Sequence, residues 1–411
     1  MKITKEQLKQ IIKEELQRVR EKYATPRRSE LIPFHGNMLI EDLIANEPVI
    51  ITLTHNGLIK RTNLTEYRAQ RRGGKGVIGM ATKTKSVIEG KNKDFVEHLF
   101  TASTHDYLMF FTNTGRVFVE RVHEVPEMSR TSQGRGIANV LELQPNEKIA
   151  ALIRVESQSD EKKKDTTWEQ PGFLLFATEN GTIKKTELSA FKNHRKGGIR
   201  AIKILEEDRL IEVKLTTGEN NVILITRNGK SIRFNETDAR SMGRVTTGVR
   251  GISLANDDKV VGLSIIEDGA TLLVASEKGI GKRTTFEEYR QQSRGGKGII
   301  TMRTTDKTGG IVGALTVHDH DEIMLITVGG QMVRIKVDDV RETGRNTMGV
   351  KLVETGKKDK LQAIAPGISE ENEDEDTEEE GSNDTGDDTP SEPTAEGSDE
   401  TTQEPTESSD E

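Results

Sequence analysis

The stretch QRRGGKG at residues 70–76 recurs almost intact as SRGGKG at residues 293–298. The preceding residues match as well, since EYRAQ at 66–70 corresponds to EYRQQ at 288–292. Glycines let backbone N–H groups approach an anion closely, and the cations add charge where a phosphate would sit. A single copy is equally well explained as a solvated turn. Two copies in matching contexts indicate a repeated structural element.

A second regularity gives the period of the repeat. Six apolar segments each end in a tight turn containing glycine and resume as a charged strand. The turn glycines are Gly57, Gly115, Gly181, Gly229, Gly279 and Gly330, spaced 48 to 66 residues apart. Because three of the turns read Asn-Gly, we expect type I′ hairpins. A second glycine element follows each turn after 17 to 19 residues and leads into a short apolar strand, as at 77–78 and 299–300.

Six units of roughly 50 residues, each with several strands, predict an all-β, six-bladed, propeller-like ring. A β-solenoid of six units is the alternative, but its usual repeat is shorter. Before the ring, residues 4–23 predict a helix, because Thr4 and Gln7 form a capping box, an apolar stripe follows, and Pro26 ends the pattern. We expect this exposed stripe to need a partner.

The chain thus divides into four predicted parts. We expect a helix within residues 1–30, a linker and entry strand at 31–48, the β ring at 49–368, and a disordered acidic tail at 369–411.

Charge is distributed unevenly along the 411 residues. The net charge of −8 combines a tail, residues 370–411, that holds 20 acids and no base, with residues 1–369, whose net charge is +12. A basic body suggests a surface for a polyanion, which the tail opposes as an intramolecular competitor. The open alternative is a tail that only solubilises the chain. Without cysteine, disulfides and thiolate chemistry are excluded. With no signal peptide or apolar span, we expect a soluble cytoplasmic protein.

Cations also recur in register with the hairpins. The residue four positions past the turn glycine is Arg61, Lys185, Arg233, Arg283 and Arg334 in five of the six units, with Lys60, Lys184 and Lys282 just before three of them. Since equivalent positions of like blades share one face of a ring, these residues predict a band of positive charge. The alternative is that they are ordinary exposed strand residues.

Catalytic chemistry is not indicated. The Gly-Gly-Lys-Gly loop at 73–76 lacks the spacing of a nucleotide-binding P-loop. The sequence His318-Asp319-His320-Asp321 contains metal-binding residue types, but it is more typical of a solvated loop because no third clustered ligand accompanies it. We find no acid/base pair or nucleophile, and therefore predict a binding module with no catalytic residue and no metal site.

These motifs together resemble a known family. The box at 70–76, with Glu41-Asp42-Leu43-Ile44, the residues L-T-x-x-G-x-I-K-R at 53–61, and G-R-N-T-x-G-V at 344–350, is similar to the C-terminal domain of the DNA gyrase A subunit. The likeness runs from about residue 20 to residue 365. It implies a six-bladed β-pinwheel whose basic rim bends and wraps duplex DNA without sequence preference. Residues 5–32 resemble the end of the coiled coil that precedes this domain in the full gyrase protein.

The resemblance also implies a set of DNA-binding residues. They are the box residues Gln70, Arg71, Arg72, Gly73, Gly74, Lys75 and Gly76, which would help close the ring, and Lys60, Arg61, Lys184, Lys185, Arg233, Lys282, Arg283, Arg294, Lys297 and Arg334.

In this family, wrapping supports ATP-dependent negative supercoiling by the complete gyrase. The chain contains no counterpart of the breakage-reunion domain or its active-site tyrosine, so catalysis by this chain alone is not expected. The implied partners are duplex DNA, the gyrase cleavage domain and the gyrase B subunit, in a chromosome-associated assembly. ATP and Mg²⁺ would belong to other parts of the enzyme. Two alternatives remain: a β-propeller scaffold for protein partners, and the C-terminal domain of a topoisomerase IV-like protein, whose box is degenerate.

Overall fold

The computed structural model describes residues 4–25, 43–66, 94, 96–129, 131–158, 165–328, 332–356 and 359–367. Several sequence predictions fall outside these residues. They concern the box at 70–76, the short strand at 77–78, the turn glycine Gly330 and the tail at 369–411.

The N-terminal helix forms as predicted. Helix α1 (Lys5–Tyr23) begins at Thr4, whose Oγ1 accepts a hydrogen bond from the Gln7 backbone N–H at 3.4 Å, while Gln7 Oε1 accepts one from the Thr4 N–H at 3.0 Å. This pair is the predicted capping box. No residue of α1 is buried, and its apolar stripe, with Leu16 at 63% exposure, faces solvent. Among the described residues, no helix has the length and apolar character that crossing a membrane requires.

Short strands make up the rest. They are β1 (Pro48–Thr54), β2 (Leu58–Asn63), β3 (Val96–Ser103), β4 (Tyr107–Thr112), β5 (Arg116–Arg121), β6 (Arg135–Gly136), β7 (Ile149–Val155), β8 (Phe173–Thr178), β9 (Thr182–Glu187), β10 (Ile199–Arg200), β11 (Leu210–Thr216), β12 (Asn221–Thr226), β13 (Lys230–Asn235), β14 (Val249–Arg250), β15 (Val260–Ile265), β16 (Thr271–Ser276), β17 (Ile280–Thr285), β18 (Ile299–Ile300), β19 (Ile311–Val317), β20 (Glu322–Thr327), β21 (Met332–Lys336), β22 (Val350–Lys351) and β23 (Leu361–Pro366).

Each of the six hairpins runs into a short 3₁₀ turn. These turns are η2 (Leu64–Glu66), η3 (Val122–Glu124), η6 (Leu188–Phe191), η7 (Glu236–Asp238), η8 (Phe286–Glu288) and η9 (Val337–Asp339), and two further ones, η4 (Ile137–Asn139) and η5 (Thr167–Glu169), lie in the connections.

The strands form six antiparallel sheets that share one plan, in which each blade borrows its outer strand from the next repeat. In the first sheet, ordered β3-β1-β2-β6, the hairpin β1-β2 pairs with β3 of its own repeat, and β2 pairs with β6, which follows the hairpin of the second repeat. Four more sheets follow the same rule, ordered β10-β5-β4-β7, β11-β8-β9-β14, β15-β12-β13-β18 and β19-β16-β17-β22. Within the described residues, the sixth sheet is β21-β20-β23.

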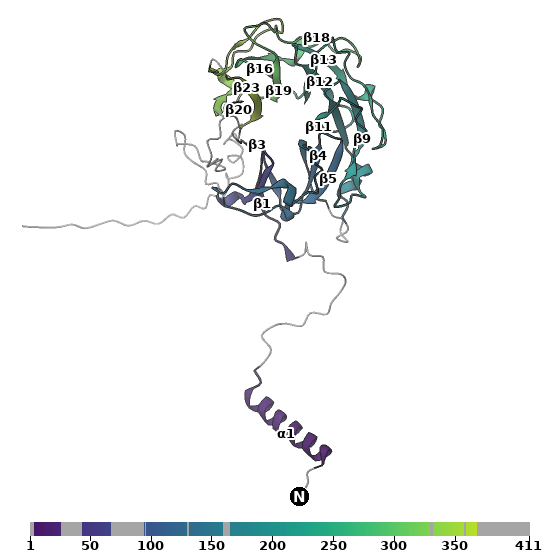
Figure 1. The fold of residues 1–411 in the computed structure, drawn as a ribbon, viewed down its shortest axis with the longest axis vertical. Coiled ribbons are helices and arrows are strands. Elements are labelled where there is room, and N and C mark those ends of the chain that lie inside the picture. The colour runs from purple at the N-terminus through teal and green to yellow at the C-terminus, as the bar shows by residue number, and fades with distance from the viewer. Residues whose placement is uncertain are drawn as a thin grey trace, which may run out of the picture. The chain divides into compact units, whose positions relative to one another are not determined.

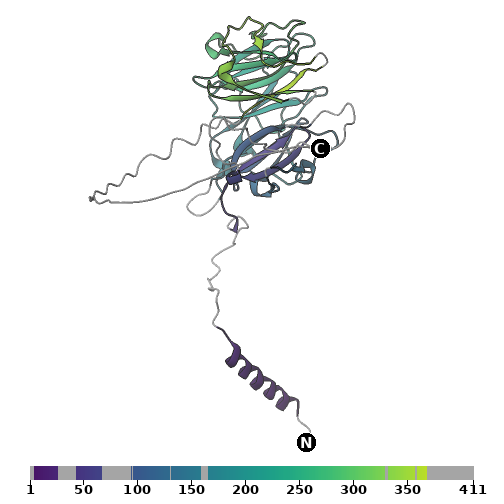
Figure 2. The ribbon, with the colours of Figure 1, turned by 90° about the vertical axis from the view of Figure 1, so that its left-hand side faces the viewer.

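The six blades follow one another in chain order around a ring, from β1 and β3 back to β20 and β23 (Figure 1). Figure 2 shows the same blades from the side. The predicted six-bladed propeller is therefore confirmed. What the sequence did not predict is the exchange of outer strands, which among the described residues links each of the first five blades to its successor.

The hairpin turns differ from the predicted type I′. Gly57 has φ +80°, but Asn56, Asn180 and Asn228 do not have the positive φ that a type I′ turn requires at its first central residue. Instead, the Gly57 N–H donates to the Thr54 carbonyl at 2.9 Å, which closes a three-residue loop with glycine in the left-handed position. The Leu58 N–H then donates to Thr54 Oγ1 at 3.0 Å, so a threonine three residues before the glycine helps to fix the loop.

Apolar cores fill the spaces between consecutive blades. Every residue of β4 is buried, because this strand packs against a neighbouring blade on each of its two faces. Phe110 and Phe118 join blades one and two, and Phe111 and Phe176 join blades two and three, with the two rings edge to face at 5.5 Å. Later blades are joined in the same way. Burial on both faces explains why the hairpin strands read as apolar runs.

Candidate nucleic-acid interface

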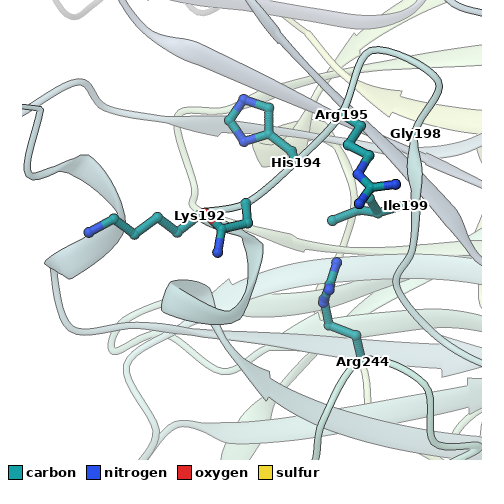
Figure 3. A pocket seen from close by; sticks show the side chains of 7 residues that line it. Lys192, His194, Arg195, Gly198, Ile199 and Arg244 are labelled. Atoms are coloured by element: carbon teal, nitrogen blue, oxygen red, sulfur yellow. The ribbon is translucent and has the colours of Figure 1, made fainter.

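Three lysines that the sequence assigned to DNA contact have side chains that are fully buried within the propeller. Lys60, Lys184 and Lys282 are each 0% exposed. Lys184 Nζ donates to the carbonyl oxygens of Ala201 at 2.6 Å and of Arg244, in the loop drawn in Figure 3, at 2.7 Å. The Ala201 carbonyl directly follows β10, and the Arg244 carbonyl lies in the loop before β14. A single ammonium group therefore joins the outer segments of two repeats.

The other two lysines make the same kind of contact. Lys60 Nζ donates to the carbonyls of Ser129 at 3.1 Å and Ser132 at 3.2 Å, and Lys282 Nζ donates to those of Gly344 at 2.7 Å and Arg345 at 2.5 Å. Every one of these acceptors belongs to the repeat after the lysine. A buried ammonium group cannot reach a phosphate at the surface. The assignment of these three lysines to DNA contact is therefore corrected to a role in holding the exchanged segment.

Burial alters the acid-base chemistry of two of these groups. It lowers the pKa of Lys184 to about 7, with a smaller contribution from the nearby Arg244 guanidinium, and lowers the pKa of Lys282 to about 8, with a smaller contribution from Arg345.

The cations one position further on mostly bind backbone carbonyls in, or directly after, the 3₁₀ turn of the following repeat. Arg61 Nε donates to the Val125 carbonyl at 2.9 Å, Arg233 Nη1 to that of Phe286 at 2.8 Å, and Arg283 Nε to that of Val340 at 2.6 Å. The backbones run beside each other here, because Arg61, Arg233 and Arg283 form parallel bridges to that next repeat. These arginines therefore fix the position at which each borrowed segment begins. This role differs both from the predicted band of surface charge and from the alternative that they are ordinary exposed strand residues.

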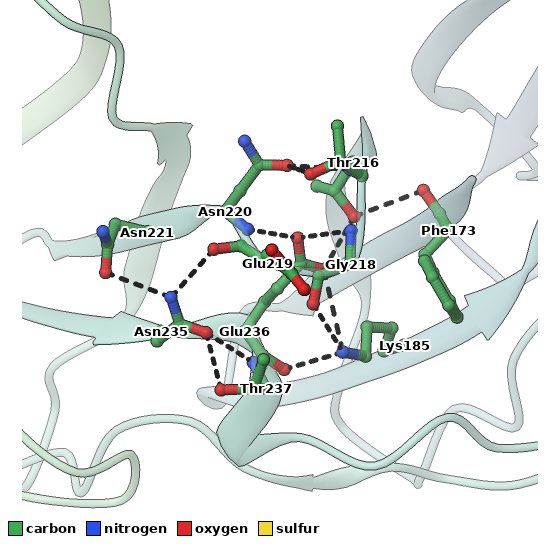
Figure 4. A network of polar contacts seen from close by, with 11 residues as sticks. Phe173, Lys185, Thr216, Gly218, Glu219, Asn220, Asn221, Asn235, Glu236 and Thr237 are labelled. Carbon is green, nitrogen blue, oxygen red and sulfur yellow. Dashed lines mark hydrogen bonds and ion pairs between the residues drawn. The ribbon is translucent and has the colours of Figure 1, made fainter. Parts of the chain in front are cut away.

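Lys185 belongs to a buried polar network (Figure 4). Its Nζ donates to the carbonyls of Glu236 at 3.0 Å and Gly218 at 3.3 Å and lies 4.0 Å from Glu236 Oε2. The Glu236 carboxylate in turn accepts hydrogen bonds from the backbone N–H groups of Gly218 and Asn220 and from the Thr216 hydroxyl. Because the ammonium group and the carboxylate both have partners, the network fixes the junction between blades three and four.

Arg334 differs from the other four hairpin cations. Its side chain is 41% exposed and is ion-paired with Glu322 of the same blade. An exposed ion pair leaves the guanidinium accessible but partly neutralised.

Exposed cations gather instead on the exchanged strands and the loops before them. Arg135, Arg200, Arg250 and Lys351 lie on β6, β10, β14 and β22, and all four are exposed. We call them the outer-strand cations. Arg200, Arg250 and Lys351 occupy the same register position against the neighbouring hairpin, so they recur at one edge of the second, third and fifth blades, whereas Ile300 takes this position in the fourth.

Of the remaining predicted DNA-binding residues, Lys297 is exposed, whereas Arg294 is partly buried. Arg294 Nε donates to the Asp238 carbonyl at 2.9 Å and its Nη1 to the Arg250 carbonyl at 3.1 Å. The box residues Gln70, Arg71, Arg72, Gly73, Gly74, Lys75 and Gly76 lie outside the described residues.

Sequence reasoning missed the outer-strand cations, although a signal was present. Each second glycine element is accompanied by basic residues, as in NHRKGGIR at 193–200, SMGRVTTGVR at 241–250 and TGRNTMGVK at 343–351. When these three segments are aligned on their glycines, the cation at the end of each one falls at the same position.

The described residues contain no cluster of three potential metal ligands, and His318 lies 3.8 Å from Asp321 as an exposed pair.

This geometry defines a β-propeller with exchanged outer strands and exposed cations along its outer edge. A family model described as "DNA gyrase C-terminal domain, beta-propeller" matches one blade at a time, at residues 48–101, 106–156, 172–217, 220–267, 270–318 and 321–366. The chain belongs to this family.

Relatives of known identity agree with this assignment. The chain is 41% identical over 362 residues to the DNA gyrase A subunit of Streptomyces coelicolor, covering 86% of this chain and 40% of that protein. It is 39% identical over 378 residues to the corresponding protein of Mycobacterium tuberculosis, covering 92% and 43%. The chain thus spans about 40% of the length of these relatives.

Two solved structures share the fold. One is the C-terminal domain of DNA topoisomerase IV, with a TM-score of 0.65, 28% identity, and coverage of 80% of this chain and 95% of that one. The other is the DNA gyrase A C-terminal domain, with a TM-score of 0.61, 26% identity, and coverage of 78% and 100%.

The buried lysines can be tested through stability. Replacing Lys184 with Met removes the donor for the carbonyls of Ala201 and Arg244, and each unsatisfied buried group costs about 1–3 kcal/mol. We expect Lys184→Met to lower the free energy of unfolding by roughly 2–4 kcal/mol in equilibrium urea unfolding. The exposed Lys203 of the same repeat supplies the control Lys203→Met, which should change little.

The pH profile of the same pair of proteins gives a second check. The folded-state pKa of Lys184, about 7, lies below its unfolded value, so the unfolded state binds more protons between these two values. The stability contributed by Lys184 therefore rises with pH across this window and is lost progressively as pH falls back toward 7. The stability difference between wild type and Lys184→Met should grow from about pH 7 to about pH 9.5. Equal stability of the two Met variants would contradict the structural role.

Proposed function

We propose that this chain binds duplex DNA with little sequence preference and bends it around the outer edge of the ring. The observation that carries this proposal is the recurrence of the outer-strand cations, since Arg200, Arg250 and Lys351 repeat at one register position. Cations that recur at one edge of the ring suit the DNA backbone, which presents phosphates at regular spacing. No recognition helix is found among the described residues of the ring, so base readout has no obvious element.

Bending follows from the arrangement of the blades. Cations on successive blades of a ring point in different directions, so a straight duplex reaches only a few of them. Bending 20–30 base pairs by 40–90° costs on the order of 1–6 kcal/mol, which contacts to several blades must offset.

We further propose that the chain acts as the C-terminal part of a DNA gyrase A subunit. Membership in the gyrase C-terminal domain family and 39–41% identity to proteins of this kind support the role. Wrapping would then serve ATP-dependent negative supercoiling by an assembly at the chromosome in the cytoplasm. The gyrase cleavage domain and B subunit would supply DNA cleavage and the sites for ATP and Mg²⁺.

Two alternatives predict different behaviour. A topoisomerase IV-like role is favoured by the similarity to the topoisomerase IV C-terminal domain, but the intact QRRGGKG box at 70–76 favours gyrase. A protein-binding scaffold would need no row of exposed cations and would bind DNA weakly at any salt concentration.

The outer-strand cations can be separated from charge in general. We expect the triple variant Arg200→Ala, Arg250→Ala, Lys351→Ala to bind duplex DNA more weakly. The slope of log affinity against log salt should become shallower by about 0.9 for each lost phosphate contact, so the total change in slope for three contacts should be about 3.

A control variant of equal charge change replaces Lys148, Lys259 and Lys360 with alanine. These exposed lysines immediately precede the strands β7, β15 and β23, away from the outer strands in the order of each sheet. The binding and salt slope of this variant should stay near those of the wild type. Equal losses in the two variants would show that only net charge matters, and a flat salt response of the wild-type chain would reject DNA binding.

The box is expected to contribute to wrapping more than to affinity. Replacing Arg71, Arg72 and Lys75 with alanine leaves the outer-strand cations in place, so binding should persist. Ligating nicked plasmid in the presence of the full chain should change its linking number with the wild-type protein and much less with this variant. A proportional loss of binding and wrapping would make the box one more cation cluster.

A further inference from the structure

A basic pocket lies where the outer segments of the third and fourth repeats meet. Its volume is about 510 Å³, and it is lined by Lys192, Asn193, His194, Arg195, Gly198, Ile199 and Arg244. No lining residue is acidic. Figure 3 shows the guanidinium groups of Arg195 and Arg244 extending toward one another, while Lys192 points away. Lys192 is paired with Glu169 at 2.8 Å, so the two arginines supply the net charge.

The repeat explains why Arg244 is unpaired. An arginine four residues before the glycine that precedes the outer strand recurs as Arg244, Arg294 and Arg345. Arg294 contacts Asp238, through its backbone N–H to the carboxylate and its Nε to the carbonyl, and Arg345 Nε lies 3.8 Å from Glu288 Oε2.

Asp238 and Glu288 are both the third residue of a 3₁₀ turn, nine positions past the turn glycine. In the third repeat that position is Ala190, the third residue of η6. The acidic residue that contacts the equivalent arginine in each of the next two repeats is therefore absent beside Arg244. Among the described residues, neither Arg195 nor Arg244 has a side-chain hydrogen bond or ion pair with the protein.

The backbone that carries both arginines is fixed. The Arg244 carbonyl accepts the buried Lys184 ammonium, and the Arg195 carbonyl accepts the Gly198 N–H at 2.8 Å. Gly198 has φ +72°, and a Cβ there would lie 2.8 Å from the Phe118 ring, so only glycine suits this turn. The Lys203 N–H joins the two loops by donating to the Thr246 carbonyl at 3.0 Å. Two cations on a fixed backbone form a preorganised anion site.

The geometry points to a specific ligand: Arg195 and Arg244, which line this pocket, clamp a phosphate group of the DNA backbone. This assignment rests on the proposed DNA-binding function and adds a fixed anchoring point to it. Guanidinium groups match the geometry of phosphate oxygens, and two of them suit one phosphodiester. A free phosphate ion shares this chemistry, so the test separates the two sources.

The key variant restores the missing acid. Ala190→Asp places a carboxylate where Asp238 and Glu288 lie in the next repeats, and it should pair with Arg244 without removing a cation. We expect about a tenfold loss of affinity for a short duplex, the loss expected for one charged hydrogen-bonded contact, and a salt slope shallower by about 1. Arg244→Ala should give the same result. The control Ala255→Asp makes the identical change at an exposed alanine of the fourth repeat and should bind almost as the wild type does.

The chain contains its own reporter. Trp168, the single tryptophan, is buried, and its ring centroid lies 5.3 Å from that of His194, which lines the pocket. Trp168 emission should respond to the duplex in the full wild-type chain and in Ala255→Asp, but not in Ala190→Asp or Arg244→Ala.

The outcomes distinguish this inference from the proposed function. Wild-type duplex binding that Ala190→Asp leaves unchanged, in affinity and in emission, would overturn the clamp while DNA binding stands. An emission response to inorganic phosphate without one to the duplex would overturn the DNA assignment of the pocket. No duplex binding by the wild-type chain would reject the proposed function itself.

Discussion

The structure depends on the burial of cations against backbone carbonyls of the following repeat. A two-residue outer strand such as β10 or β14 makes few ladder hydrogen bonds and cannot hold its place unaided. The segments around these strands are bound by the ammonium groups of Lys60, Lys184 and Lys282 and the guanidinium groups of Arg61, Arg233 and Arg283. These side chains supply donors to buried carbonyl groups, and leaving the carbonyls unpaired would be costly.

This constraint divides the basic residues into two groups. The cations of the hairpins are mostly buried or partly buried and act between blades, whereas the outer-strand cations are exposed at the outer edge. The two groups are related, because the borrowed strand that the buried cations hold is the strand that carries Arg200, Arg250 or Lys351. Cohesion of the ring and presentation of charge thus come from the same strand exchange.

Much of the fold could be predicted from the sequence. Six glycine turns at a near-constant spacing indicated the blade number, and the capping box at Thr4 and Gln7 indicated the start of α1. The type I′ turns were wrong, because Asn-Gly also suits a three-residue loop whose glycine alone has positive φ. Strand exchange was not predictable from the pattern, since a short apolar strand pairs equally well with its own hairpin or with the previous one.

The site was predicted less well than the fold, because burial of an ammonium group is rare and depends on carbonyls far away in the sequence. Lys184, for example, is 60 residues from Arg244, whose carbonyl it binds.

The central claim is that buried lysines hold the ring while exposed cations of the exchanged segments meet DNA. Acetylation of individual lysines, followed by mass spectrometry with and without duplex DNA, tests both halves at once. The account predicts that Lys60, Lys184 and Lys282 stay unmodified in either condition, and that Lys297 and Lys351 are modified in the free chain and protected by DNA. Rapid modification of the three buried lysines in the free chain, with DNA protecting them and not Lys351, would contradict it.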